Sequence, residues 1–350
     1  MTNLTTCLAH SEAALRAWWD GAPQKYPCLL LSAAKPGGSP IPDTDDLERH
    51  WNDVELIVER QMANLEQTEY YGVSVPFHAV SYGSSAMSGV LGARMELLNR
   101  QTVWAHPVFD SIEQLLEVDL HPETPCCRTL QEVTRRSVAL SPGHHFVAHF
   151  PLEGVTDLAA GLYGTDNLLA DLILKPAQVK RAFAHLKRLW IETFDRIAAL
   201  IAQGGNPGGI GWAGIWAPGT TFPLQEDFSF MISREMYDEF CLPQVADMAD
   251  AMDYPMYHLD GVPAARHLDS LLGLKKLRAI QWVPGPGNEP IHLWYELLRR
   301  IIAAGKSVEV FARPDEIEDL VDQVGARGLL ISVQDASRED IERLLDKYGD

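Results

Sequence analysis

The sequence predicts an α/β fold, specifically a (β/α)8 TIM barrel with an N-terminal helical extension. Eight short apolar or alternating segments, bounded by glycine and proline, have the character of strands, and nearly all are separated by segments with helical length and periodicity. Strands that alternate with helices form right-handed βα units around a parallel sheet, and a closed barrel needs eight of them. No linker rich in Pro, Gly or Ser divides the chain, so we expect one domain over residues 1–350.

The predicted strands are 28–33, 72–80, 144–152, 208–217, 256–261, 277–283, 307–312 and 328–334. The clearest helix is 176–203, because it begins on a proline suited to a first helical turn and ends before two glycines. A further helix begins at Ser233, a good N-cap, and we expect Pro243 to end or kink it. We expect the segment 100–125 to form a hairpin or an irregular strand outside the βα units, folded over the mouth of the barrel.

The composition excludes several classes of protein. A formal net charge of −19 opposes the attraction to phosphates on which nucleic-acid binding depends. No segment reaches the roughly 18 apolar residues of a membrane span, and the N-terminus has no secretory pattern. The cysteines are odd in number and widely spread, without a CxxC pair, so neither a disulfide framework nor a zinc finger is indicated. We therefore expect a cytoplasmic protein that binds neither nucleic acid nor membrane.

The segment YPMYHLDG, residues 254–261, is the strongest candidate for chemistry. Successive side chains of a strand alternate between its faces, so His258 and Asp260 point to one side before Gly261 breaks the strand. In a barrel the active site lies at the carboxyl ends of the strands. We interpret His258 and Asp260 as catalytic residues and metal ligands; the alternative is a hydrogen-bonded pair that satisfies buried groups.

Other polar and aromatic residues near predicted strand ends are candidate substrate contacts, although histidines inside barrels are often merely hydrogen-bonded and tryptophans usually pack in the core. Trp212 and Trp216 alternate on one strand face and, with Trp282, could wall a pocket. The candidates from this group are His78, Tyr82, His149, Glu153, Trp216, Trp282 and Arg313.

Several segments, in order and spacing, resemble the uroporphyrinogen decarboxylase superfamily over roughly residues 60–335. They are EYYGVSVPFHAVSYGSSAM, PLEGVTDLAAGLYGTDNLLADLILKPAQV, LQEDFSFMISREMYDEFCLPQ and HLDG. The cobalamin-linked methyltransferase branch of that superfamily carries His-x-Cys-Gly where this chain has HLDG. The resemblance implies a divalent metal, zinc first, and a corrinoid carried by a partner protein. It also implies that Tyr163 occupies the place of a substrate contact, where the alternative is a core tyrosine.

Two departures from the family narrow the prediction. The arginine-rich stretch that holds the porphyrin carboxylates is replaced by SAAKPGGSP, so the tetrapyrrole substrate is excluded. The cysteine ligands are absent, and near the last strand the chain reads ISVQDAS. A His and carboxylate site is compatible with zinc or a harder ion, and it would be completed by Gln334 or Asp335 and by Glu226 or Asp227. Of these we select Gln334 as the third metal ligand.

We therefore predict an enzyme that transfers a methyl group from a small, uncharged or weakly charged, oxygen-bearing substrate to a corrinoid. The first alternative is a metal-assisted lyase or hydrolase that acts on a small polar or glycosidic substrate, with His258 and Asp260 as acid and base. The second is a non-catalytic binder of a small molecule. A homodimer is left open.

Overall fold

The computed structural model describes residues 4–288 and 290–349. Its largest sheet has seven strands in the order β2-β1-β13-β12-β11-β10-β9, and all neighbours are parallel except β2, which pairs antiparallel with β1. This confirms an α/β fold. The bounds are β1 Cys28–Ala34, β2 Thr68–Gly72, β9 Thr221–Leu224, β10 Tyr254–Asp260, β11 Ala279–Val283, β12 Ser307–Ala312 and β13 Leu329–Val333.

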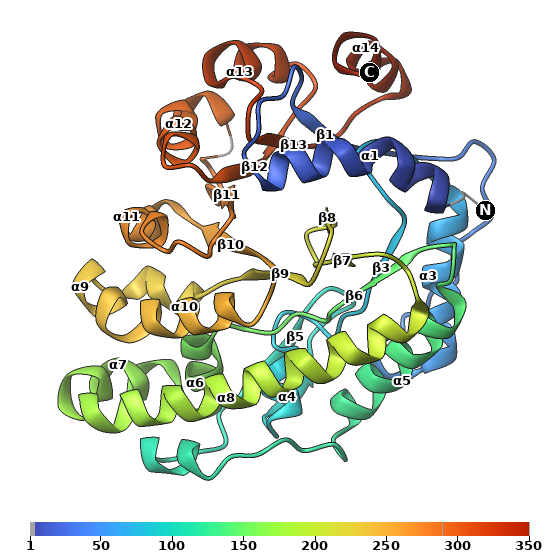
Figure 1. The fold of residues 1–350 in the computed structure, drawn as a ribbon. Helices are drawn as coiled ribbons and strands as arrows, with labels where there is room; N and C mark the ends of the chain where they lie inside the picture. Colours follow the sequence, from blue (N-terminus) through green and yellow to red (C-terminus); the bar gives the residue numbers. More distant parts are fainter. Residues whose placement is uncertain (1–3, 289, 350) are drawn as a thin grey trace.

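Three two-stranded sheets complete the strands that the structure describes. They are the parallel pair β3 Phe77–Ala79 with β6 Phe146–Ala148, and the antiparallel pairs β4 Arg94–Leu97 with β5 Val103–His106 and β7 Gly209–Ile210 with β8 Trp216–Ala217. In Figure 1 the strands from β1 to β9 follow an arc, and β6 and β3 lie on the remaining side of a common interior. Among the described residues no ladder joins β3 or β6 to the seven-stranded sheet.

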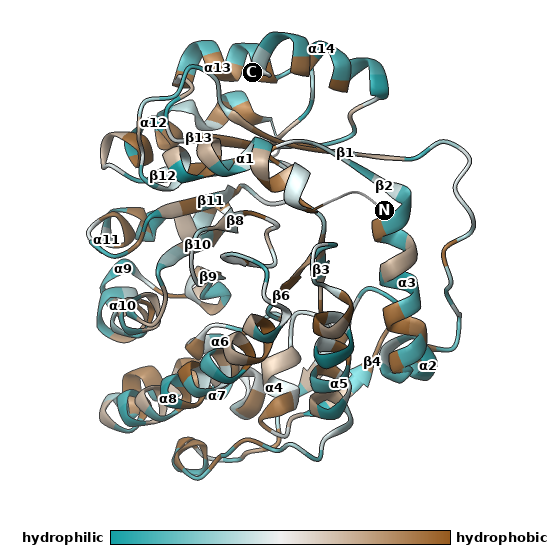
Figure 2. Cartoon of the chain, turned by 45° about the vertical axis from the view of Figure 1, so that its right-hand side comes forward, coloured by the Kyte–Doolittle hydropathy of each residue, from teal (hydrophilic) through white to brown (hydrophobic). Residues whose placement is uncertain are grey.

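The helices lie outside this arrangement of strands, and in Figure 2 they combine hydrophilic and hydrophobic residues, whereas most strands are hydrophobic. None of the described helices is both long and apolar enough to cross a membrane. The α-helices are α1 Leu4–Trp19, α2 Leu47–Asn52, α3 Val54–Gln67, α4 Ala86–Val90, α5 Pro125–Leu140, α6 Val155–Tyr163, α7 Thr165–Leu174, α8 Pro176–Ile201, α9 Arg234–Met236, α10 Leu242–Asp250, α11 Leu268–Leu272, α12 Tyr295–Ala303, α13 Ile317–Val324 and α14 Arg338–Tyr348. Short 3-10 turns are η1 Ile112–Leu116, η2 Ala202–Gly204, η3 Asp227–Met231, η5 Val262–His267 and η6 Ile291–Trp294.

The segment 208–217 is not the barrel strand that we predicted. It forms the hairpin β7–β8, because its glycines provide the left-handed turns at Gly208 and Gly214, which have φ of 78° and 75°. The parallel strand at this place is β9, which begins four residues further along the chain. The predicted hairpin within 100–125 begins earlier, because the β4–β5 pair spans residues 94–106.

Pro243 does not end the helix: it lies in the first turn of α10, directly after a π-helical turn. A proline lacks the N–H that would bond to the carbonyl four residues earlier, and its ring crowds that carbonyl. The chain widens into a π-helical turn, η4 Tyr237–Cys241, and then continues as α10.

Helix α1 closes the end of the sheet at which the parallel strands begin. The Trp18 Nε1 donates to the carbonyl of Val308 at 3.4 Å, and the Ser307 hydroxyl donates to the carbonyl of Trp18; both residues open β12. Leu15 and Trp18 are fully buried in a core cluster with Met256 of β10. The amino ends of the strands are therefore covered, and their carboxyl ends stay available for a functional site.

Candidate metal centre

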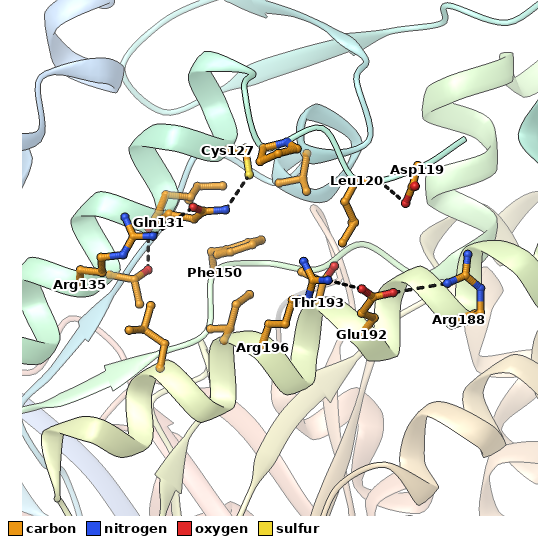
Figure 3. A pocket seen from close by; sticks show the side chains of 16 residues that line it. Asp119, Leu120, Cys127, Gln131, Arg135, Phe150, Arg188, Glu192, Thr193 and Arg196 are labelled. Atoms are coloured by element: carbon orange, nitrogen blue, oxygen red, sulfur yellow. Dashed lines mark hydrogen bonds and ion pairs between the residues drawn. The ribbon is translucent and has the colours of Figure 1, made fainter. Parts of the chain in front are cut away.

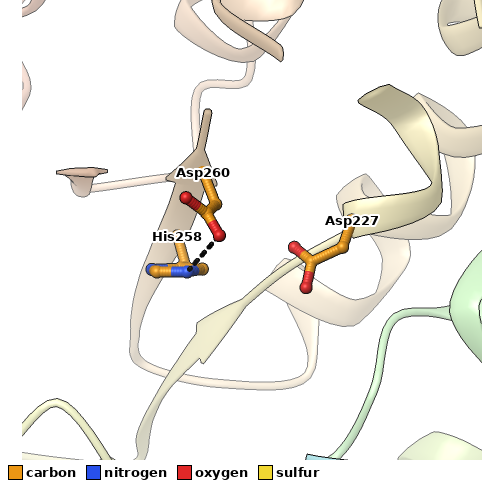
Figure 4. Close-up of side chains that lie close together, drawn as sticks. All are labelled: Asp227, His258 and Asp260. Atoms are coloured by element: carbon orange, nitrogen blue, oxygen red, sulfur yellow. Dashed lines mark ion pairs between the residues drawn. The ribbon is translucent and has the colours of Figure 1, made fainter. Parts of the chain in front are cut away.

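Three side chains of the types that can bind a metal converge at the carboxyl ends of β9 and β10. One ligand atom each from Asp227, His258 and Asp260 lies within 4.8 Å of the other two. In Figure 4, Asp227 faces the other two from the start of η3. The side chain of His258 is 15% exposed and that of Asp260 44%. The cluster is therefore reachable from solvent but anchored in the fold.

Strand alternation places His258 and Asp260 together, as the sequence predicts. Both lie on the same face of β10 as Met256, which belongs to the core beneath α1, so this face points into the interior. Tyr257 points the other way and is fully buried. Gly261 ends the strand with φ of 83° and ψ of 144°, a conformation open essentially only to glycine.

Two carboxylates that cap neighbouring helices place Asp227. The Glu226 carboxylate is buried and accepts the backbone N–H groups of Val155 at 3.0 Å and Thr156 at 2.9 Å, which begin α6. In return, the Asp157 carboxylate of α6 accepts the N–H groups of Asp227 at 2.9 Å and Phe228 at 2.6 Å. Glu226 is thus committed to capping, and Asp227 is left to face the cluster.

The carboxyl groups at the cluster and beside it have raised pKa values, mainly because they are buried. Burial raises the pKa of Asp227, and Asp260 raises it further, while His258 lowers it. Burial and the charges of Asp227 and Glu226 raise the pKa of Asp157 well above its usual range. Burial also raises the pKa of Glu226 to about 7. A divalent cation would relieve this repulsion by favouring the charged forms.

The hydrogen-bond partner of His258 decides which ring nitrogen is available. The Nδ1 atom contacts Oε1 of Gln281, an acceptor, so this nitrogen carries the proton. The Nε2 atom lies 4.0 Å from Oδ2 of Asp260, on the side of the cluster. The indole of Trp212 stands edge-on to the imidazole at 5.1 Å. One imidazole and two carboxylates fit zinc or a harder divalent ion, whose ligand bonds are about 2.0–2.2 Å long.

The predicted contacts His78 and His149 lie away from this cluster as buried histidines. The Nδ1 of His78 hydrogen-bonds the Ser137 hydroxyl at 2.8 Å, and burial lowers its pKa to about 3. The ring of His149 stacks on Phe194 at 4.5 Å, and burial lowers its pKa to about 4. Both are neutral at physiological pH and have the surroundings of core residues.

The two predicted tyrosines also have partners of their own. The Tyr82 hydroxyl donates to Asn52 Oδ1 at 2.8 Å, and the Tyr163 hydroxyl donates to Asp171 Oδ2 at 2.9 Å. Burial raises the pKa of each to about 12, so both keep their protons. These bonds match the alternative interpretation of Tyr163 as a core residue.

Glu153 and Arg313 differ in burial but both are engaged elsewhere. The buried Glu153 accepts the N–H groups of Met87 at 2.7 Å and Ser88 at 3.1 Å, which begin α4, and burial raises its pKa to about 7. Arg313 is half exposed and pairs with Glu316 at 3.3 Å.

The predicted tryptophans pack in the core. Trp216 is buried, and its Nε1 donates to the carbonyl of Pro207 at 2.8 Å. Trp282 is fully buried against Trp294, with ring centroids 5.0 Å apart. Of the three tryptophans that could wall a pocket, Trp212 is the one that contacts the cluster.

Gln334 follows β13, is exposed, and lines a solvent-open pocket of about 240 Å³. Ala213 and Gly214, which follow Trp212 in the chain, line the same pocket, whereas none of the three cluster residues does. None of the described residues that line it is charged. The polar ones are Ser32, Tyr70, Ser74, Ser332 and Gln334.

A larger cavity of about 660 Å³ lies outside the sheet, between α5 and α8 (Figure 3). Arg188 and Arg196 at its rim both pair with Glu192, at 3.4 and 2.5 Å. Its floor includes the buried Phe150. None of the three cluster residues lines it, and neither does any residue that we predicted as a site residue.

Comparison with known proteins supports the fold. No family model matches the chain, and a search of curated proteins finds no match. Among solved structures, a methyltransferase from Methanosarcina mazei is similar, with a TM-score of 0.61 and 13% sequence identity over 99% of this chain and 98% of that one. At this identity the similarity establishes a shared fold along the whole chain.

Proposed function

We propose that the chain is one domain, a divergent barrel of the uroporphyrinogen decarboxylase superfamily, that catalyses metal-dependent methyl transfer to a corrinoid carried by a partner protein. The observation that carries this proposal is the cluster of Asp227, His258 and Asp260 at the carboxyl ends of β9 and β10. The similarity in fold to a protein described as a methyltransferase supports it.

In this proposal the three side chains bind one divalent ion, zinc first. His258 contributes Nε2, and Asp227 and Asp260 each contribute a carboxylate oxygen. The bound ion would supply Lewis acidity toward an ether or hydroxyl oxygen. Five free cysteines exist, but none belongs to the cluster, so the site is harder than one built to activate a thiol.

We propose that the pocket lined by Ala213, Gly214 and Gln334 binds the substrate. Because its described lining has no charged side chain, it favours an uncharged molecule, and hydroxyl and amide groups such as those of Ser332 and Gln334 suit an oxygen-bearing one. We therefore assign Gln334 to substrate binding in place of the ligand role that we predicted from the sequence. A volume of about 240 Å³ limits the substrate to a small molecule.

The test is a methyl-transfer screen with cob(I)alamin and small methyl ethers, on metal-loaded protein. We expect turnover by the wild type and at least a 100-fold loss in His258→Ala and Asp260→Ala. The control is Asp335→Asn, which changes an exposed acidic residue after β13 that is outside the cluster. Turnover that survives both alanine substitutions would contradict the proposal.

A metal-assisted lyase or hydrolase is the second candidate, and the hard ligand set favours it. In that case His258 and Asp260 would act as acid and base on a small polar or glycosidic substrate. The same variants separate the two reactions: cleavage or dehydration that depends on His258, without methyl transfer, would select this candidate. Ligand binding without any turnover would indicate a non-catalytic binder.

A further inference from the structure

Four polar side chains form a row across the inner faces of β10, β11, β12 and β13. We call His258, Gln281, Glu309 and Ser332 the polar row. The sheet register pairs His258 with Gln281 and Gln281 with Glu309, so these three lie side by side at one level of the sheet. The Ser332 hydroxyl donates to Glu309 Oε1 at 2.7 Å.

The chemistry of the row sets the direction of its hydrogen bonds. Glu309 receives hydrogen bonds from the Ser332 hydroxyl and from the Gln281 side chain, and the donor of that amide is its N–H end. The carbonyl end of Gln281 then faces His258 Nδ1, where the contact is observed. His258 therefore donates through Nδ1, and its Nε2 lies on the side of Asp260.

The burial of Glu309 is costly, and the packing of the strand does not demand it. Its side chain is fully buried, burial raises its pKa to about 7, and Ser332 and Gln281 oppose this effect. Within residues 4–288 and 290–349 its Oε2 has no close hydrogen-bond partner. An apolar side chain would avoid this desolvation cost. The carboxyl group therefore has its clearest effect through Gln281, on His258.

We propose that Gln281 and Glu309 are positioning residues that hold His258 with its proton on Nδ1 and aim Nε2 at a divalent ion. This inference rests on the proposed metal centre. A second group that orients a ligating histidine typically contributes 10–100-fold to metal affinity, because it fixes the tautomer and the ring orientation. In the polar row, the amide of Gln281 orients His258, and the buried carboxyl group of Glu309 orients that amide.

The first measurement reads the tautomer directly, without metal. In ¹⁵N-labelled protein, long-range ¹⁵N–¹H spectra distinguish protonated from unprotonated ring nitrogens, and His258→Gln assigns the signals. We expect a single Nδ1-protonated form in the wild type and a mixed or Nε2-protonated form in Gln281→Leu. The matched control is Gln244→Leu, which removes another buried glutamine, on α10, and should leave the His258 signals unchanged.

The second measurement is the affinity for Zn²⁺ and Mn²⁺ by competition with a chelating dye. We expect Gln281→Leu and Glu309→Leu to bind about 10–100-fold more weakly than the wild type. Glu309→Gln should recover most of the affinity, because its amide oxygen can still accept from Gln281. Circular dichroism checks that each variant keeps the fold. A merely structural role for Glu309 would not produce this order of metal affinities in variants with an unchanged fold.

The outcomes separate positioning from the reaction. Tight metal binding that depends on Gln281, in a protein without methyl transfer, would support positioning and contradict the proposed reaction. An unchanged tautomer and unchanged metal affinity in Gln281→Leu would overturn positioning even if methyl groups are transferred. A wild type that binds no divalent ion would overturn both.

Discussion

At the scale of single residues, Gly261 ends β10. Asp260 is therefore the last residue of the strand. The backbone conformation of Gly261, φ 83° and ψ 144°, is strained for any residue with a Cβ atom. We expect Gly261→Ala to lower the free energy of unfolding by about 1–3 kcal/mol. It should also weaken metal binding, because a strained backbone at residue 261 would shift the carboxylate of the preceding residue, Asp260.

Urea denaturation of Gly261→Ala beside Val262→Ala provides the check. Val262 is the next residue and is 37% exposed, so its truncation should change stability little. Equal stability of the two variants would show that the turn at Gly261 carries no strain.

The burial of Glu309 leads to a prediction about how the stability of the protein depends on pH. Burial raises its pKa in the folded protein to about 7, from an ordinary value of 4.5. Because the folded state binds this proton more tightly than the unfolded state, the group destabilises the fold progressively as the pH rises from 4.5 through 7. We expect the melting temperature of Glu309→Gln, relative to the wild type, to increase between pH 5 and pH 8. A constant difference over that range would contradict the raised pKa.

At the scale of elements, α6 and η3 stabilise one another through their exchanged caps. Asp157 accepts two backbone N–H groups of η3, at 2.9 and 2.6 Å. We expect Asp157→Ala to cost about 1–3 kcal/mol of stability, because both donors lose their acceptor. It should also weaken metal binding, because Asp227 is the first residue of η3.

Calorimetry and metal titration of Asp157→Ala test this coupling, with Asp166→Ala as the control. Asp166 is an exposed acidic residue in the first turn of α7, where no side-chain cap is observed. Lower stability with full metal affinity in Asp157→Ala would show that η3 keeps its place without the cap.

The elements that the sequence predicts best are β10 to β13. Each is a continuous, largely apolar run, and the alternation along YPMYHLD correctly places His258 and Asp260 on one face. The prediction fails at 208–217, where glycines favour a hairpin, and it misses β9, which has only four residues and contains Pro223. Because β9 was not predicted, the sequence did not show that Asp227 follows the end of a strand. Asp227 therefore remained one of several candidates to complete the metal site.

The polar row could not be predicted either. Gln281 lies near a predicted strand end, but its contact with His258 depends on the register between strands 23 residues apart in the chain. Glu309 lies in the middle of an apolar strand, and periodicity alone does not show whether such a side chain is buried. Pairing information, absent from a single sequence, was the missing signal.

At the scale of the whole molecule, α1 covers the end of the sheet opposite to the candidate metal centre. Leu15 is fully buried in the cluster that contains Trp18 and Met256. We expect Leu15→Ala to lower the free energy of unfolding by about 2–5 kcal/mol, with unchanged metal affinity in the protein that stays folded. Leu140→Ala is the control, since Leu140 is 47% exposed. A loss of metal affinity in Leu15→Ala would show that the two ends of the sheet are coupled.

The central claim is that Asp227, His258 and Asp260 bind a divalent ion at the carboxyl ends of β9 and β10. Element analysis of purified protein, dialysed against excess zinc and then against metal-free buffer, tests it most directly. We expect about one ion per chain in the wild type and in Asp335→Asn, and less than about a tenth of that in His258→Ala and Asp227→Asn, since each of the latter removes one of three ligands. Equal metal content in all four proteins, or none in the wild type, would contradict the claim.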